Sequence, residues 1–229
     1  MPNTHERIIV SLGGSLLVPD QIDTDFLHRF RDIILKKIGE GFSFCVIVGG
    51  GRTARRYQEA ASRVAQPSSA DLDWLGIHAT RLNAHLLRTL FNSEVYPHVI
   101  KNPEADIDVS KPLIIAAGWQ PGFSTDYDAV LISKNLGAYR MANLLDVDYV
   151  YDKDPKKFPD AKKFERLSWA EFRTMVPDHW DPGLSSPFDP VAAKEAEMLG
   201  LEVAIINGAN LDRFESYLDE KPFVGTVIS

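Results

Sequence analysis

Short runs of β-branched and other apolar residues alternate along this chain with longer segments of helical period. The strongest runs cover residues 8–10, 43–48, 113–116, 141–147 and 202–206, and weaker ones cover residues 95–100 and 225–228. The strong runs are apolar at consecutive positions, as strands buried on both faces are. Strands that alternate with helices are typical of a mainly parallel sheet with helices on both sides. The sequence therefore predicts an α/β fold.

Apolar spacing and capping residues predict helices between these runs. Residues 26–38 carry one apolar stripe, residues 52–65 follow a glycine turn, and residues 72–91 have an apolar face formed by Leu75, His78, Ala79, Leu82, Leu86 and Leu90. The length of the last segment suits a helix that spans two lobes or forms a dimer. Caps at Ser124, Ser168 and Asp189 predict three more helix starts, and Gly137 and Gly200 predict two helix ends.

The composition limits the size of the fold and the kind of partner. The chain has 229 residues, 45% of them hydrophobic, which is enough for one large domain or two closely joined lobes. Its formal charge of −7 argues against binding nucleic acid or an acidic membrane by bulk charge. The single cysteine, Cys45, lies in a strand run, which excludes an intrachain disulfide and favours a reducing compartment. Because no apolar run approaches about 20 residues and no signal-peptide pattern is present, we expect a cytoplasmic protein.

A first glycine turn, Gly13-Gly14 in the segment SLGGS, follows the first predicted strand. Adjacent glycines let the backbone approach a ligand closely and present N–H groups to a phosphate, although an ordinary tight turn explains them equally well. The segment matches neither GxxxxGK[ST] nor GxGxxG, which argues against a P-loop and against a Rossmann dinucleotide site.

A second turn, Gly49-Gly50-Gly51, leads from the second predicted strand into a helix that carries Arg52, Arg55 and Arg56. Glycine backbone, helix N-terminal N–H groups and guanidinium groups together favour the binding of an anion. We expect at least one of the three arginines to lie instead on a solvated helix face. The second turn thus predicts a phosphate site more strongly than the first.

A third glycine element, GWQPGFSTD at residues 118–126, joins a buried strand to a capped helix start. Backbone donors there could hold a second phosphorylated ligand, and Trp119 or Phe123 could lie against a base, with core packing an equally good explanation for Phe123. An acidic segment follows the run at residues 141–147, and ligands collect at the carboxyl ends of parallel strands. Within it, we interpret Asp148 and Asp152 as solvated carboxylates.

Six segments taken in order resemble the amino acid kinase superfamily and, within it, the archaeal-type UMP kinases: SLGGSLL, VIVGGGRTARRY, DLDWLGIHATRLNAHLL, GWQPGFSTDYDAVLISKNLGA, LLDVDYVYDKDPKKFPDAKKFERLSWAEF and FDPVAAKEAEMLGLEVAIINGANL. The similarity runs from about residue 8 to the C-terminus. It implies a single amino acid kinase domain over residues 1–229, folded as a three-layer αβα sandwich around a mainly parallel sheet. The N-terminal lobe, residues 1–110, would hold the acceptor, and the C-terminal lobe, residues 111–229, would hold ATP.

The resemblance implies ATP-dependent phosphorylation of UMP to UDP in pyrimidine nucleotide synthesis, with Mg²⁺, by a homohexamer built from dimers. By motif match, the residues that would bind ATP are Ser11, Leu12, Gly13, Gly14, Ser15, Gly51, Arg55, Asp146, Tyr151 and Asp154. Those that would bind UMP are Gly50, Asp73, Trp119, Gln120, Pro121, Gly122, Phe123, Ser124 and Thr125. Three would act in catalysis: Arg55 by supplying charge, Asp146 by orienting cationic groups, and Lys194 as a second cation. No metal ligands are assigned.

Four positions depart from the superfamily pattern. Ser11 stands where many members have a lysine, Ala117 and Trp119 replace a smaller glycine and threonine, and Tyr149 replaces a glycine. These departures leave two alternatives open. One is a related kinase with another small acceptor, such as an acylglutamate, carbamate or isopentenyl phosphate kinase, although the histidine-containing element of the last group is missing. The other is a nucleotide-binding protein without turnover, similar to molybdate-storing relatives.

Overall fold

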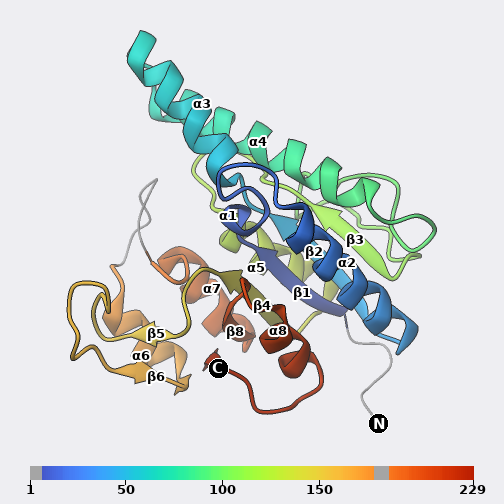
Figure 1. Ribbon diagram of the computed structural model, residues 1–229, viewed down its shortest axis with the longest axis vertical. Coiled ribbons are helices and arrows are strands. Elements are labelled where there is room, and N and C mark those ends of the chain that lie inside the picture. The colour runs from blue at the N-terminus through green and yellow to red at the C-terminus, as the bar shows by residue number, and fades with distance from the viewer. Residues whose placement is uncertain (1–6, 178–185) are drawn as a thin grey trace.

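A computed structural model describes residues 7–177 and 186–229, and its centre is one seven-stranded sheet in the order β3-β2-β1-β4-β8-β9-β7 (Figure 1). The strands are β1 Arg7–Leu12, β2 Ser43–Val48, β3 Leu113–Ala116, β4 Arg140–Leu145, β7 Arg166–Leu167, β8 Glu202–Asn207 and β9 Gly225–Ile228. Paired neighbours are parallel except β8 and β9. A separate antiparallel hairpin joins β5 Val150–Tyr151 to β6 Lys163–Phe164. The predicted mainly parallel sheet is confirmed.

Helices cover both faces of the sheet, which makes the predicted three-layer αβα sandwich (Figure 1). They are α1 Gly14–Leu17, α2 Thr24–Gly39, α3 Gly51–Val64, α4 Ser69–Thr89, α5 Thr125–Leu136, α6 Trp169–Met175, α7 Pro190–Leu199 and α8 Leu211–Leu218. Successive strand side chains point to opposite faces. Ile8 and Val10 of β1 therefore pack in one core with α2, α4 and α8, whereas Ile9 packs in the other with α5, α6 and α7.

The predicted caps and most predicted strands are present. Ser124, Ser168 and Asp189 each accept a hydrogen bond from the first turn of the following helix, and Gly137 and Gly200 end α5 and α7 in the left-handed conformation. The continuous strand predicted at residues 95–100 is wrong. Only Val95 and Ile100 form isolated bridges with β3, and Pro97 between them has no N–H to continue a ladder.

Only part of the apolar face predicted for helix α4 turns to the core. Ala79 is buried, and Leu86 and Leu90 pack against the core, whereas Leu82 is 63% exposed and His78 is exposed as well. The buried positions of the helix are Ile77, Ala79, Thr80, Asn83, Ala84 and Leu87. Small side chains such as Ala79 and Ala84 allow the helix to lie close to its neighbours, and two of the polar residues bind backbone groups at the site described below. α3 and α4 contact each other and extend beyond the sheet (Figure 1).

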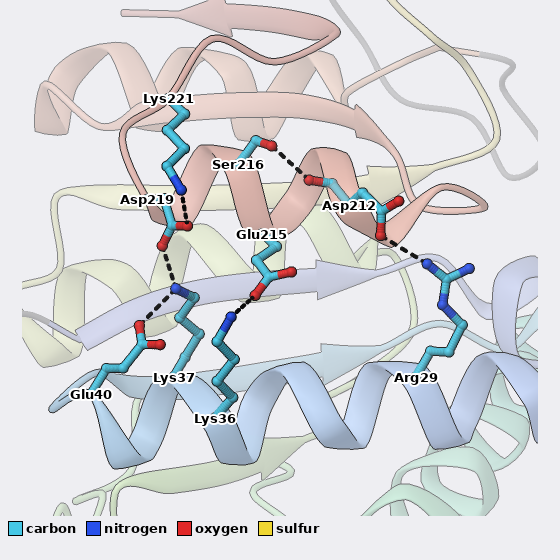
Figure 2. Close-up of polar contacts among 9 residues, drawn as sticks. All are labelled: Arg29, Lys36, Lys37, Glu40, Asp212, Glu215, Ser216, Asp219 and Lys221. Carbon is cyan, nitrogen blue, oxygen red and sulfur yellow. Dashed lines mark hydrogen bonds and ion pairs between the residues drawn. The ribbon is translucent and has the colours of Figure 1, made fainter.

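A row of ion pairs joins α2 to α8 and to the turn that follows it (Figure 2). The side chain of Lys37 is only 1% exposed, and its ammonium group contacts Asp219 and lies 2.7 Å from Glu40. Lys36 pairs with Glu215 at 2.6 Å, and Arg29 pairs with Asp212 at 2.9 Å. A buried ammonium group requires such compensation, so Lys37 anchors the C-terminal end of α2 to the end of α8.

Two further expectations concern Cys45 and the membrane. Cys45 is fully buried in β2, and burial raises the pKa of its thiol to about 12. Within residues 7–177 and 186–229, no helix combines the length and the apolar character that crossing a bilayer requires.

Candidate functional site

The loops after β1, β2, β3 and β4 meet at one edge of the sheet because these four strands are parallel neighbours. The first two loops are the two glycine turns, and they lie in direct contact. A Cβ atom added to Gly14 would lie 2.2 Å from the Gly51 nitrogen and 2.4 Å from the Gly49 carbonyl oxygen. Gly51 itself has a φ of 60°, which glycine adopts without strain. The two turns thus form one continuous backbone surface that no side chain interrupts.

Hydrogen bonds hold this pair of turns in place. The Gly49 N–H donates to the Leu12 carbonyl at 2.9 Å, and the buried amide of Asn83 donates to the carbonyls of Gly49 and Gly50 at 2.9 and 3.2 Å. The Gly13 N–H donates to the Leu144 carbonyl at 2.9 Å. Gly13 therefore aligns the first turn with the end of β4, and its N–H is already occupied. Asn83 was not singled out from the sequence, since a lone asparagine on an apolar helix gives no local signal.

The three arginines after the second turn have different surroundings. Arg56 lies 2.5 Å from Asp20, and Arg52 lies 3.9 Å from Glu59. Arg55 is exposed, and within residues 7–177 and 186–229 it has neither an ion pair nor a hydrogen bond. Of these three arginines, Arg55 is therefore the one whose guanidinium group has no partner among the described residues.

The third glycine loop, residues 117–124, is bound by side chains from helices on both sides of the sheet. From α4, the Thr80 hydroxyl accepts the Gly118 N–H at 2.9 Å, Asp73 accepts the Gly122 N–H at 3.0 Å, and Arg81 donates to the Trp119 carbonyl at 2.9 Å. From α5, Asp128 accepts the Trp119 N–H at 3.0 Å. The structure thus brings Asp73 to the loop with which it was grouped on the sequence.

Aromatic rings follow one another along this loop and into α5. The ring centroids of Trp119 and Phe123 are 5.1 Å apart, and those of Phe123 and Tyr127 are 5.3 Å apart. All three residues are partly exposed. The loop therefore carries an aromatic surface beside backbone groups and beside the start of α5, where Ser124 is the cap and Thr125 is the first residue.

A polar cluster lies beneath the first turn. The buried hydroxyl of Ser11 donates to Asp126 at 3.0 Å, and Asp126 accepts the Asp189 N–H at 3.4 Å. The Ser124 hydroxyl donates to the Asp189 carboxylate at 2.5 Å. Burial raises the pKa of Asp126 to about 7, and the charge of Asp189 raises it further, while the Ser11 hydrogen bond opposes the shift. The sequence predicts Asp126 only as part of a helix start. A second carboxylate beside the Ser-Thr cap is the local signal that could have indicated its role.

The predicted donor residues of the acidic segment are spread over the end of β4 and the hairpin. Asp146 is exposed just after β4, Tyr151 lies in β5, and Asp154 is exposed in the turn that follows. Lys194 is exposed on α7 and makes no ion pair within the described part of the chain. No hydrogen bond between described residues joins any of these four to the glycine turns.

Asp148, interpreted as a solvated carboxylate, has a side chain that is 47% exposed and is also held by two partners. Asp148 accepts hydrogen bonds from Asn207 at 2.8 Å and from Arg213 at 2.5 Å. These two bonds hold its pKa below the ordinary value, the one from Arg213 most strongly. Arg213 lies 65 residues further along the chain, so local sequence could not reveal the contact, which ties the loop after β4 to α8.

Contacting glycine turns, an unpaired arginine and a ring-lined loop, all at the carboxyl edge of a parallel sheet, define an α/β protein of the phosphate-binding class. Comparison with known families agrees. Residues 6–207 match the amino acid kinase family. The chain belongs to the amino acid kinase family.

Individual relatives carry more specific names. A uridylate kinase of Thermococcus sibiricus is 37% identical over 203 residues, which are 87% of this chain and 89% of that protein. A uridylate kinase of Methanospirillum hungatei is 34% identical over 225 residues, or 97% of this chain and 94% of that protein. The crystal structure of uridylate kinase from Archaeoglobus fulgidus superimposes with a TM-score of 0.82 at 28% identity, covering 97% of this chain and 99% of that one.

Proposed function

We propose that this protein transfers the γ-phosphoryl group of ATP to UMP, which forms UDP and ADP and serves pyrimidine nucleotide synthesis. The observation that carries the proposal is the direct contact of Gly14 with Gly49 and Gly51, which joins the two glycine turns into one backbone surface. Relatives that match over most of their length are named uridylate kinase. That name supports UMP over the other acceptors of the family and over nucleotide binding without turnover.

The proposed roles divide the site into a donor and an acceptor side. ATP phosphates lie on the surface formed by residues 11–15 and Gly51, and the donor nucleotide extends toward Asp146, Tyr151 and Asp154 of the C-terminal lobe. UMP lies between Gly50, Asp73 and the loop of residues 119–125. Leu12 is buried and its side chain belongs to the core, so its contribution is limited to the backbone. The N–H of Gly13 is donated to the Leu144 carbonyl and is not free to bind a phosphate. Gly13 therefore contributes only by allowing the ligand to approach the backbone closely.

The reaction requires charge stabilisation and alignment more than covalent chemistry. A phosphate oxygen of UMP is already ionised, so no general base is required to activate it. Arg55 neutralises charge on the transferring group, Lys194 supplies a second cation, and Asp146 orients cationic groups near them. Ser11 stands where many members of the superfamily have a lysine, and a serine supplies no positive charge. Its hydroxyl is instead held by Asp126 beneath the turn at 3.0 Å.

We also propose Mg²⁺ as the metal that accompanies ATP. Mg²⁺ retains several waters and commonly binds through substrate phosphates and only one or two carboxylates. The described residues contain no group of three or more carboxylate, histidine or cysteine side chains suited to hold a metal. This pattern fits an ion carried mainly by the nucleotide, which would neutralise developing charge on the phosphate oxygens, and we assign it no protein ligand.

The test is an ADP-release assay with ATP and Mg²⁺ across a panel of UMP, CMP, AMP, GMP, carbamate, acetylglutamate and isopentenyl phosphate. We expect UMP to be the preferred acceptor. Turnover with a different acceptor while UMP remains inert would contradict the proposal, and so would ATP binding with no acceptor-dependent ADP release.

The role of Arg55 is tested by Arg55→Ala, with Arg63→Ala as the matched control on the last turn of the same helix. Loss of one charge-stabilising donor typically lowers turnover by about 10²–10³-fold. We expect a loss of this size for Arg55→Ala and no loss for Arg63→Ala. Equal activity of the two variants would remove Arg55 from the mechanism.

We further propose a homo-oligomer, a hexamer built from dimers, in solution. Tyr57 and Val64 on α3, and Trp74 and Leu82 on α4, are large apolar side chains that lie exposed on the helices that extend beyond the sheet. Such a surface is typical of an interface. Light scattering after gel filtration should give a mass of several chains, and Leu82→Glu should lower it; a monomeric wild-type protein would contradict this.

A further inference from the structure

Asp128 is the most completely buried carboxylate of the candidate site. It lies in the first turn of α5 and is 0% exposed. One carboxyl oxygen, Oδ2, accepts the Trp119 N–H at 3.0 Å, and the other, Oδ1, has no hydrogen-bond partner among the described residues. An unpartnered buried oxygen is costly. An aliphatic side chain would place no unpartnered polar atom there, so the carboxyl group calls for an explanation beyond packing.

The hydrogen bond from Trp119 to Asp128 differs from the other hydrogen bonds that hold the third glycine loop in the helix that it comes from. The other anchors described above, Asp73, Thr80 and Arg81, all come from α4, on one side of the sheet. Asp128 binds the loop from α5, on the opposite side. The loop is therefore held between the two helical layers, and Asp128 sets its position relative to α5.

The same helix turn also binds the first glycine turn. Asp126, two residues before Asp128, holds the hydroxyl of Ser11. The start of α5 thus carries two carboxyl groups, one bonded to the proposed donor turn and one to the proposed acceptor loop. Because both are attached to one rigid helix, the distance between donor and acceptor depends on both bonds.

We propose that Asp128 is a positioning residue that aligns bound UMP with ATP by holding Trp119, and that it does so most strongly as the ionised carboxylate. The inference rests on the proposed function, since it takes the third glycine loop as the UMP site. A hydrogen bond to an ionised acceptor is roughly twice as strong as one between neutral groups. The affinity for UMP accordingly rises as Asp128 loses its proton.

The surroundings of Asp128 allow it to titrate near neutral pH. Burial raises its pKa to about 7, and the Trp119 N–H opposes the shift. The elements packed most closely on α5 are β1, β2, β4 and α7. Their charged or titratable side chains are Arg7, Cys45, Arg140, Lys194, Glu195 and Glu197, with Asp189 at the cap of α7 and Asp126, Tyr127 and Lys134 on α5 itself. Burial and the hydrogen bond from Trp119 account for the shift in the pKa of Asp128.

The test compares the wild type with Asp128→Asn from pH 5.5 to pH 8.5. Asparagine keeps an oxygen that can accept the Trp119 N–H, and it does not ionise. The phosphate of UMP and Asp126 titrate in the same pH range in both proteins, so the ratio of the two KM values isolates Asp128. We expect the KM for UMP of the variant, divided by that of the wild type, to lie near 1 at pH 5.5. At pH 8.5 it should reach about fivefold, which corresponds to roughly 1 kcal/mol. The KM for ATP should not change.

A second variant removes the acceptor oxygen. Asp128→Leu leaves the Trp119 N–H unpaired at every pH, so its KM for UMP should be about tenfold above that of the wild type at pH 8.5, and its ratio to the KM of Asp128→Asn should not depend on pH. If this variant does not fold, Asp128→Asn still decides the question. A ratio for Asp128→Asn that stays constant with pH, or an equal rise in the KM values for UMP and ATP, would overturn the proposal.

A measurement without turnover separates this inference from the proposed function. In protein labelled with ¹⁵N-tryptophan, which has four tryptophans, the Trp119 amide resonance should titrate with a midpoint near pH 7 in the wild type and not in Asp128→Asn. If UMP proves inert while this titration is present, the proposed substrate is refuted, and the pH-dependent hydrogen bond between Asp128 and Trp119 is still supported. If UMP is phosphorylated and the amide does not titrate, the proposal for Asp128 fails.

Discussion

The substitution Gly14→Ala would test whether contact between the two glycine turns is essential. The alanine Cβ would lie 2.2 Å from the Gly51 nitrogen and 2.4 Å from the Gly49 carbonyl oxygen, whereas ordinary contact begins at 3.4 Å. Both neighbours are backbone atoms, so no side chain can rotate away. The turns must separate by about 1 Å to admit the methyl group, a shift of the size that costs about 10²-fold in rate when catalytic groups move.

The expected cost in stability follows from the same geometry. Overpacking by one methyl group typically costs about 1–3 kcal/mol, and the upper end applies where only backbone can yield. For a domain of this size, 1 kcal/mol changes Tm by roughly 2–4 °C, so we expect Gly14→Ala to lower Tm by about 6–12 °C. The assays are thermal unfolding followed by circular dichroism and ADP release with UMP as acceptor.

Gly137→Ala is the matched control. Gly137 ends α5 with a φ of 62°, and an added Cβ meets no atom within 4 Å. It therefore suffers only the strain of a left-handed residue, about 1–2 kcal/mol, with no displacement of either turn. We expect a small decrease in Tm and unchanged turnover. A Gly14→Ala protein whose turnover matches that of Gly137→Ala would refute the view that the two turns form one phosphate-binding surface.

Two further predictions concern stability. Lys37→Met leaves the carboxylates of Asp219 and Glu40 without their shared ammonium group. Because both carboxylates are partly exposed, we expect a loss of only about 1–2 kcal/mol in urea unfolding, and an unchanged midpoint would show that the ion pairs of Lys37 do not stabilise the fold. For Asp128, burial raises the pKa to about 7, so its contribution to stability is complete below its unfolded pKa and is lost as pH rises through 7. Asp128→Asn should therefore gain Tm relative to the wild type between pH 5 and pH 8, and a constant difference in Tm would contradict that pKa.

Much of the fold follows from rules that act over a few residues. Apolar runs buried on two faces locate the main strands, and the strands at residues 43–48, 113–116 and 225–228 have the predicted bounds. Caps such as Ser124 and Asp189 act on N–H groups three residues away or nearer, so they can be recognised locally. Neither α1, with four residues, nor the two-residue strands of the hairpin are long enough to show a period, and they were missed.

The candidate site divides in the same way. The glycine turns and their position after strands can be found in the sequence, because only glycine permits the backbone approach that they require. The partners that complete the site cannot be found in the sequence. Ser11 binds Asp126 across 115 residues, and Asn83 binds Gly49 across 34. Neither pair leaves a pattern in the local sequence.

Taken alone, the sequence determined the class of fold, the order of its layers and the presence of glycine turns at strand ends, since these depend on short-range periodicity and on residue type. Only the tertiary structure decided that the two turns touch, that α4 presents Thr80 and Asn83 rather than its leucines to the site, and that Asp128 faces Trp119. Those features depend on parallel strands that bring their carboxyl ends together, and on burial, which no residue has until the chain is folded.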